Sequence, residues 1–222
     1  MKKLIRGIVE FRKNATDDYR RTFSRLAIGQ SPDALFIACS DSRVAPNVFA
    51  STEPGDLLVV RNVGNMVPPS TADGISESDE SEAAAIEFAI TRLKVKDIIV
   101  CGHSECGAMQ AALQGRERLT LPNLKSWLRL AEPALRKLSQ NAALSSELPA
   151  HDLLSQWNVL EQLEHLRSYP IVREKIGAGE LALHGWWFDI AKVDVYVYEK
   201  EFGRFTLLDE TEASRILATL DR

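Results

Sequence analysis

Residues 34–43 read Ala-Leu-Phe-Ile-Ala-Cys-Ser-Asp-Ser-Arg, an apolar run that ends in a thiol, a carboxylate and a guanidinium at alternating positions. The unbroken apolar run predicts a buried β-strand over residues 34–39, because a strand covered on both faces shows no polar side. In an open α/β sheet, ligands bind just outside the carboxyl ends of the strands. Cys39, Asp41 and Arg43 are therefore the first candidate site residues.

A second apolar run, residues 97–102, leads into His103 and Cys106, and glycines flank this pair. If the two strands are neighbours, His103 and Cys106 converge with Cys39 at one edge of the sheet. Two thiolates and one imidazole leave a fourth position open, which is the pattern of a catalytic zinc ion rather than a closed structural one. Cys106 is also expected at the start of a helix, where the helix dipole favours a thiolate. The alternative is that both cysteines are ordinary buried residues and that His103 is a loop histidine.

The rest of the chain predicts an α/β fold, with a central, mainly parallel β-sheet flanked by helices and an N-terminal helical arm. Continuous apolar runs alternate with helical patterns, which indicates a parallel sheet covered on both faces. The expected strands are residues 34–39, 57–62, 95–101 and 181–188, followed by a hairpin over 193–198 and 204–208. The sequence contains no evident linker or repeat, so we expect a single domain over 1–222, with the arm at 1–28 and the α/β core at 34–222.

Two segments of the sequence need a closer look. Residues 4–28 have the periodicity of one or two amphipathic helices, which pack either on the chain's own core or on a partner chain. Residues 70–81 are small, polar and acidic, so we expect a surface loop there. Asp79 and Glu82 are spaced to form a capping box for the helix that follows.

Composition narrows the classes of function. The chain has 222 residues, 45% of them hydrophobic, which is enough for one sizeable core. A net charge of -4 gives no strong field for nucleic acid or an anionic membrane. Three cysteines are an odd number, which argues against a disulfide framework and suits a reducing compartment. The sequence shows no signal peptide, no membrane-length apolar run and no Gly-rich phosphate loop, so we expect a soluble cytoplasmic protein.

Asp41 and Arg43 follow directly after Cys39, so their chemistry has to be considered beside a metal. A carboxylate next to zinc either serves as the fourth ligand or accepts a hydrogen bond from a zinc-bound water. An arginine two residues further on can hold the carboxylate in a bidentate ion pair, which keeps the fourth position for water. The alternative is a solvated surface ion pair. The remaining thiol and imidazoles are assigned structural roles: Cys101, His151, His165 and His184.

These motifs resemble the two signatures of the β-class carbonic anhydrases. The matching segments are residues 39–43 (Cys-Ser-Asp-Ser-Arg), 103–107 (His-Ser-Glu-Cys-Gly), 53–56 (Glu-Pro-Gly-Asp), 61–65 (Arg-Asn-Val-Gly-Asn) and 183–186 (Leu-His-Gly-Trp). The resemblance covers roughly residues 1–200. It implies one Zn2+ per chain, held by Cys39, His103 and Cys106, and reversible hydration of carbon dioxide to bicarbonate and a proton. It also implies a homodimer, or a multiple of dimers, whose N-terminal helices embrace the partner.

Within this family the sequence resembles the plant-like, non-allosteric subtype. Members with an inhibitory bicarbonate site carry a Trp three residues before the first cysteine, where this chain has Phe36. Plant-like members carry a Gln nine residues before that cysteine, here Gln30, which reaches the substrate. Their apolar pocket is matched at Val63, but it usually has a Phe where Leu58 stands and a Tyr where Phe88 stands.

The resemblance also implies a mechanism. Asp41, held by Arg43, accepts a hydrogen bond from zinc-bound hydroxide and so aims its lone pair at carbon dioxide in the apolar pocket. The backbone N–H of Gly107 and the side chain of Gln30 stabilise negative charge on the substrate oxygens. Phe36 predicts that bicarbonate does not close the site, so the enzyme should stay active at about pH 7.

Two other functions fit the same residues. A hydrolase of carbonyl sulfide or carbon disulfide would keep the zinc ligands and reshape the apolar pocket. A non-enzymatic zinc-binding protein would leave the open position unused. The Asp41–Arg43 pair argues against this last function, because a structural zinc needs neither residue.

Overall fold

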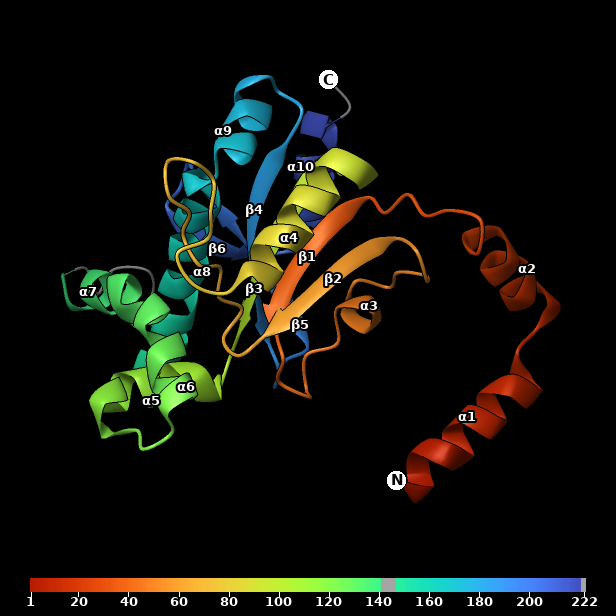
Figure 1. Cartoon of the computed structure of the whole chain (residues 1–222), viewed down its shortest axis with the longest axis horizontal. Coiled ribbons are helices and arrows are strands. Elements are labelled where there is room, and N and C mark those ends of the chain that lie inside the picture. The colour runs from red at the N-terminus through yellow and green to blue at the C-terminus, as the bar shows by residue number, and fades with distance from the viewer. Residues whose placement is uncertain (141–146, 221–222) are drawn as a thin grey trace.

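A computed structural model describes residues 1–140 and 147–220 and confirms the predicted α/β class. Within these residues, six strands form one sheet in the order β2-β1-β3-β4-β5-β6 (Figure 1). The first four strands in this order are parallel, and β5 and β6 extend the sheet as antiparallel strands. The strands are β1 (Ala34–Cys39), β2 (Leu57–Asn62), β3 (Asp97–His103), β4 (Ala182–Asp189), β5 (Asp194–Glu199) and β6 (Arg204–Leu207).

Strand β1 lies between β2 and β3, and all six of its residues are buried, as its apolar sequence predicts. Strand β3 begins and ends two residues later than the predicted 95–101. The delay arises because a π-helical turn, Ala89–Leu93, ends at Lys94 in the left-handed conformation, with φ of 56°. His103 is therefore the last residue of β3, and it lies just beyond the level of Cys39 because Cys101 pairs with Ala38.

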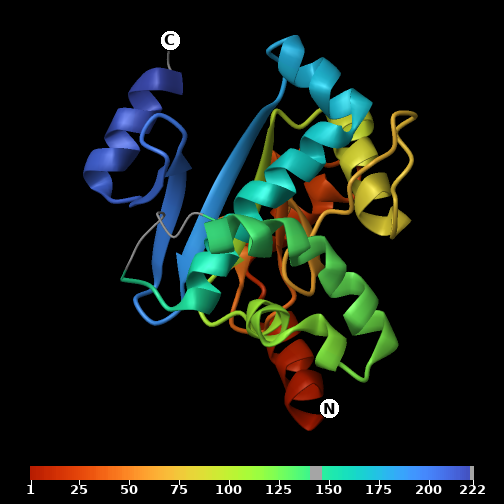
Figure 2. The ribbon, with the colours of Figure 1, turned by 90° about the vertical axis from the view of Figure 1, so that its left-hand side faces the viewer.

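Helices lie on both sides of the sheet (Figure 2). On one face, α4, α8 and α9 bury apolar residues of β1 and β3, such as Leu35 and Ile98. The other face buries Phe36, which contacts the rings of Phe49 and Trp186. The helices are α1 (Lys2–Asn14), α2 (Asp17–Leu26), α3 (Pro46–Phe49), α4 (Glu80–Phe88), α5 (Gly107–Gln114), α6 (Pro122–Trp127), α7 (Glu132–Gln140), α8 (Ala150–Ser168), α9 (Pro170–Gly177) and α10 (Glu210–Leu220).

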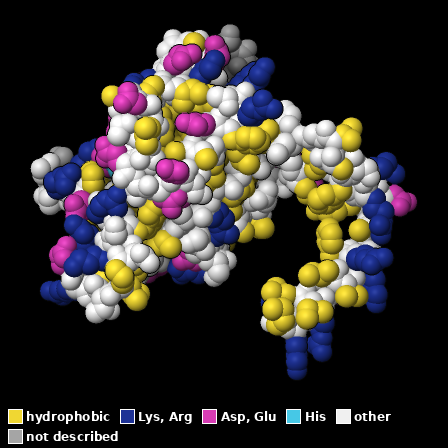
Figure 3. Space-filling model, in the orientation of Figure 1, with side chains coloured by type: hydrophobic (Ala, Val, Ile, Leu, Met, Phe, Trp, Pro, Cys, Tyr) yellow, Lys and Arg dark blue, Asp and Glu magenta, His cyan; other side chains and the backbone are white. Residues whose placement is uncertain are grey.

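The N-terminal arm, α1 with α2, projects away from the core (Figure 1). Neither helix has a buried residue. Apolar side chains gather on one side of the arm (Figure 3), where Leu4, Ile8 and Phe11 are 65%, 68% and 55% exposed. Of the two alternatives for the arm, packing on the chain's own core is not seen for these three side chains, which stay exposed. Packing on a partner chain stays a prediction.

The acidic loop 70–81 lies at the surface, and its first residue is tied to the end of α8. The backbone N–H of Ser70 donates to Oγ of Ser168 at 2.7 Å. Asp79 caps α4 by accepting a hydrogen bond from the Ser81 N–H at 2.8 Å. Glu82 does not complete the predicted capping box, because its side chain turns into the core and accepts from Nδ2 of Asn62 at 3.0 Å.

The predicted single domain, 1–222, also includes residues 141–146 and 221–222, which lie outside the described residues. Among the described residues, no helix has both the length and the hydropathy needed to cross a membrane.

Candidate metal centre

Three potential metal ligands meet at the carboxyl edge of the sheet. Cys39 ends β1, His103 ends β3, and Cys106 is the N-cap of α5. One ligand atom from each residue lies within 4.8 Å of the other two, and all three residues are buried. The parallel pairing of β1 with β3 thus brings the two sequence motifs together.

The hydrogen bonding of His103 leaves one ring nitrogen available as a ligand. Its Nδ1 lies 2.8 Å from the carbonyl oxygen of Ser104, which can only accept, so Nδ1 carries the proton. The other nitrogen, Nε2, is buried and has no hydrogen-bond partner within the described residues. A buried acceptor without a partner is costly, and a metal ion would satisfy it. A carbonyl on the opposite ring nitrogen is the usual support of a histidine ligand.

Cys39 and Cys106 form a coupled pair of thiols. A hydrogen bond from the Cys106 thiol lowers the pKa of Cys39, and the Gly64 N–H, 3.3 Å from its Sγ, lowers it further. The pKa of Cys106 is raised, first because it gives its proton to that bond and then because it is buried. The first thiol therefore ionises readily, whereas the second keeps its proton unless a cation lies between them. Two thiolates and a neutral imidazole are a donor set that fits Zn2+.

Arg43 holds the Asp41 carboxylate in a bidentate ion pair. Nε lies 3.0 Å from Oδ1, Nη2 lies 2.7 Å from Oδ2, and the Arg43 backbone N–H also donates to Oδ1 at 3.0 Å. These hydrogen bonds hold the pKa of Asp41 below its usual range, so the group is ionised at neutral pH and can only accept hydrogen bonds. The Asp41 side chain is only 17% exposed, whereas that of Arg43 is 48% exposed, so the carboxylate is the sheltered member of the pair.

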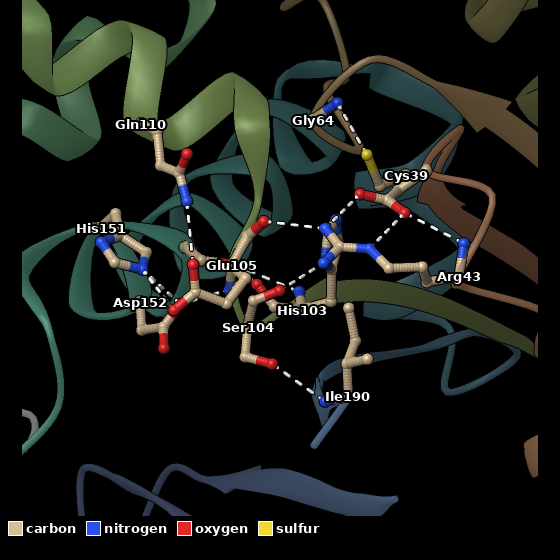
Figure 4. Close-up of polar contacts among 12 residues, drawn as sticks. Cys39, Arg43, Gly64, His103, Ser104, Glu105, Gln110, His151, Asp152 and Ile190 are labelled. Atoms are coloured by element: carbon tan, nitrogen blue, oxygen red, sulfur yellow. Dashed lines mark hydrogen bonds and ion pairs between the residues drawn. The ribbon is translucent and has the colours of Figure 1, made fainter.

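The ligand turn, residues 103–107, is held at Glu105 from two sides. Glu105 adopts the left-handed conformation with φ of 55°, which costs a non-glycine residue about 1–3 kcal/mol. Its N–H donates to Oδ1 of Asp152 at 2.7 Å, and its carbonyl accepts from Nη2 of Arg43 at 3.0 Å (Figure 4). Hydrogen bonds to charged groups each contribute about 1.5–3 kcal/mol, so the two together can offset the backbone strain.

Helix α8 presents a buried polar stripe to the ligand turn and to the loop after β2. The polar stripe consists of Asp152, Ser155, Asn158 and Gln162. Oγ of Ser155 accepts from the His103 N–H at 3.2 Å and donates to its carbonyl at 2.9 Å. Nδ2 of Asn158 donates to the Gly64 carbonyl at 3.0 Å, and Oε1 of Gln162 accepts from the Val67 N–H at 2.8 Å.

Nothing in the sequence pattern singled out the polar stripe. Its one signal is the spacing of three and four residues, which puts these polar side chains on one helix face. Close packing accompanies it, because a Cβ added to Gly102 would lie 2.8 Å from Cγ2 of Val159 and 2.9 Å from Oγ of Ser155. Gly102 thus allows the close backbone approach that its place before His103 suggests.

Two other predicted site residues lie at the same edge of the sheet as the thiols. Val63 follows β2, and its carbonyl accepts from Nε1 of Trp127 at 2.7 Å. Gly107 is the first residue of α5, and a Cβ added there would meet nothing within 4 Å. The space in front of the Gly107 backbone is therefore open.

Three predicted pocket residues lie near the opposite, amino edge of the sheet. Gln30 precedes β1 and lines a shallow hollow with Gly55 and Asp56, just before β2. Leu58 pairs with Leu35 near the start of β1. Phe88 ends α4 and is 44% exposed. Since β1 spans about 17–20 Å, one chain does not bring these three side chains to its own thiols.

The residues assigned structural roles lie apart from the thiols, with one exception. Cys101 is fully buried, and burial raises its pKa. His184 pairs with Asp97 at 2.7 Å, and Nδ1 of His165 lies 2.7 Å from the Val67 carbonyl. His151 is the exception, because it contacts the Glu105 side chain of the ligand turn.

Comparisons with known proteins agree on one family. A family model described as carbonic anhydrase matches residues 34–195, which include both ligand motifs. The carbonic anhydrase of Pseudomonas aeruginosa is 40% identical over 210 residues, covering 95% of this chain and 93% of that protein. The carbonic anhydrase of Synechocystis sp. is 39% identical over 203 residues, covering 90% of this chain and 71% of that protein.

Solved structures show the same similarity in three dimensions. The β-carbonic anhydrase CcaA superposes with a TM-score of 0.86 at 37% identity, covering 93% of this chain and 98% of that one. A structure from work on two tetrameric β-carbonic anhydrases of Sordaria macrospora gives a TM-score of 0.70 at 30% identity, covering 93% of each chain.

Proposed function

This chain belongs to the carbonic anhydrase family and is a β-class carbonic anhydrase, and we propose that it catalyses the zinc-dependent, reversible hydration of carbon dioxide to bicarbonate and a proton. The observation that carries the proposal is a buried group of two thiols and one unpartnered imidazole nitrogen beside an ionised carboxylate. The names of the relatives support the reaction, and no observation favours the carbonyl sulfide or carbon disulfide hydrolase.

Cys39, Cys106 and Nε2 of His103 are the groups that would hold one Zn2+ per chain. Zinc held there would lower the pKa of a bound water and so supply a hydroxide nucleophile. The chain supports the donor set through the Ser104 carbonyl at Nδ1 of His103 and the Gly64 N–H at Sγ of Cys39.

Asp41 orients the nucleophile. Because Arg43 keeps Asp41 ionised, its free lone pairs accept a hydrogen bond from the O–H of the nucleophile and aim the remaining lone pair at carbon dioxide. Arg43 also occupies both carboxylate oxygens, which favours Asp41 as an acceptor over Asp41 as a fourth ligand.

The Gly107 N–H, at the start of α5, stabilises the negative charge that develops on the substrate oxygens. The open space before Gly107 leaves room for the substrate, and Val63 supplies apolar surface at the same edge. The chain therefore provides the nucleophile's orientation and part of the substrate cradle from its own residues.

Gln30, Leu58 and Phe88 complete the cradle from a partner subunit in a homodimer or a multiple of dimers. Their distance from the chain's own thiols and the exposure of Phe88 support this arrangement. So do the exposed apolar side chains of the arm, which would embrace the partner, and the tetrameric relatives of Sordaria macrospora.

The subtype is plant-like and non-allosteric, and the compartment is the cytoplasm. Phe36 stands where a bicarbonate-inhibited site needs a Trp, and it is fully buried against Phe49 and Trp186. All three cysteines are free thiols, which suits a reducing compartment.

Stopped-flow measurement of carbon dioxide hydration by zinc-replete protein, at about pH 7 and about pH 8.5, tests the function and the subtype together. Fast turnover at both values is expected. Turnover only at the higher value would show that the site closes despite Phe36 and would overturn the subtype. The absence of turnover at both values, with one zinc per chain, would overturn the function.

A further inference from the structure

A second group of metal-type side chains lies on the far side of the ligand turn from Arg43 (Figure 4). It contains the carboxylates of Glu105 and Asp152 and the imidazole of His151, the latter two from the first turn of α8. One ligand atom from each lies within 4.8 Å of the other two. None of the three is a ligand of the first centre, and the proposed reaction uses none of their side chains.

The decisive observation is the state of Nε2 of His151. This nitrogen is buried, and it lies 3.1 Å from Oε1 of Glu105 and 3.5 Å from Oδ1 of Asp152. At neither distance is it aligned for a hydrogen bond, so it has no hydrogen-bond partner among the described residues. A simple ion pair would aim the ring N–H at one carboxylate, whereas here neither carboxylate accepts a hydrogen bond from this nitrogen.

The spacing of these atoms suits a metal ion. Bonds of about 2.0–2.2 Å to nitrogen and carboxylate oxygen place neighbouring ligand atoms about 3–3.5 Å apart in tetrahedral or octahedral geometry. The distances of 3.1 and 3.5 Å fall in this range. The second oxygen of Glu105, Oε2, accepts from Nε2 of Gln110 at 3.0 Å, so Glu105 offers one oxygen to the site.

The charge of the group and its exposure to solvent also favour a bound cation. When both are ionised, the two carboxylates carry a charge of about -2, which a divalent cation neutralises. The Glu105 side chain is 55% exposed, so the group is open to solvent on that side. Asp152 is buried and fixed by the Glu105 N–H, which makes it the rigid member of the set.

We propose that Glu105, His151 and Asp152 form a second divalent-cation site, of nitrogen and oxygen donors, that joins the ligand turn to α8. Its donor chemistry separates it from the first centre, because thiolates select zinc whereas imidazole with carboxylates also takes Mn2+. The proposal does not depend on the hydration reaction, since cation binding is measured directly.

The test uses full-length protein that already carries one zinc per chain. Equilibrium dialysis against Mn2+, with free Mn2+ read by electron paramagnetic resonance, should show one Mn2+ bound per chain in addition to the zinc. His151→Ala should weaken this binding at least about tenfold, as loss of a ligand requires. His184→Ala is the matched control, because it removes a histidine paired with a different aspartate and should bind Mn2+ like the wild type.

Either of two results would overturn the proposal. The first is that the wild type binds neither Mn2+ nor a second equivalent of Zn2+. The second is that His151→Ala binds Mn2+ as tightly as the wild type. A lower melting temperature of His151→Ala, with no Mn2+ bound by the wild type, would mean that the group is an ion pair only. Zinc content of one per chain shows that each variant folds, and His151→Gln replaces His151→Ala if that variant does not fold.

Discussion

The ligand turn and the N-terminal arm differ in how much of their structure the chain itself supports. The backbone N–H and carbonyl of Glu105 both have partners within the chain, and the flanking His103 and Cys106 are buried. The arm has no buried residue and exposes Leu4, Ile8 and Phe11 to solvent. A single chain therefore brings the candidate metal ligands together, whereas the proposed shelter of the arm and the proposed completion of the substrate cradle both require a second chain.

Cys106→Ser is the strongest test of the proposal that a single chain holds the metal. A serine hydroxyl is a poor zinc ligand at neutral pH, so we expect zinc affinity to fall by at least about 100-fold and hydration activity to fall with it. Zinc content after dialysis measures the effect. Cys101→Ala is the matched control, because Cys101 is equally buried but lies away from the ligand group. Full zinc retention by Cys106→Ser would contradict the proposed ligand set.

The arm is tested by placing charge on its apolar side. Ile8→Asp combined with Phe11→Asp should convert the oligomer to monomers and lower activity at least about tenfold, because an apolar surface that two chains cover is lost. Zinc content should stay at one per chain. Sedimentation velocity and metal analysis measure the two effects, and Lys3→Asp, on the charged side of α1, serves as the control.

A monomeric variant with undiminished activity would contradict the proposal that a second chain completes the substrate cradle. It would show that one chain supplies the whole cradle.

Replacing Asp152, which holds the ligand turn through the Glu105 N–H, should have a smaller effect on zinc affinity. Asp152→Ala leaves the Glu105 N–H without its acceptor, so we expect zinc affinity at the first centre to fall about 10-fold. Asp152→Asn keeps an acceptor oxygen and should restore most of this loss. Competition with a chromophoric chelator measures both variants. Equal affinity in Asp152→Ala and the wild type would show that Arg43 holds the turn without help from α8.

The smallest expected effect concerns pH. Burial lowers the pKa of His165, so the folded protein disfavours the charged imidazole, while the unfolded chain takes up the proton at about pH 6.5. The unfolded state therefore binds more protons as pH falls below about 6.5, and stability decreases in that range. Urea unfolding at a series of pH values measures this. His165→Gln should flatten the profile, and an unchanged slope in that variant would contradict the role given to His165.

Sequence reasoning reached the fold and the ligand candidates because both depend on short, local patterns. Apolar runs set β1 and β2 to the residue, and the side chains that follow β1 and end β3 lie at one edge by the rule for parallel strands. The bounds of β3 were predicted two residues too early because a π-helical turn has no simple sequence signal.

The partners of the ligand turn were missed for a different reason. Asp152 and Ser155 lie almost fifty residues after the turn in sequence, on a helix that is buried on most sides, and no local pattern pairs them with it. The role of Glu82 was also missed because its partner is distant in sequence. Its spacing from Asp79 fits a capping box, but the Asn62 amide in the core binds its carboxylate instead. The two possible partners of the arm were indistinguishable, since the same amphipathic pattern serves either surface.

The polar stripe of α8 links the candidate metal centre to this helix, so we expect the two to open as one cooperative unit. Its four side chains bind the ligand turn and the loop after β2 together, so neither loop can open without breaking hydrogen bonds to the same helix face. Amide protons of the ligand turn and of the middle of α8 should therefore exchange with solvent in a single opening event. Removal of the metal by a chelator should accelerate amide exchange in both segments by the same factor. The lifetime of the bound metal should then equal the lifetime of the docked helix.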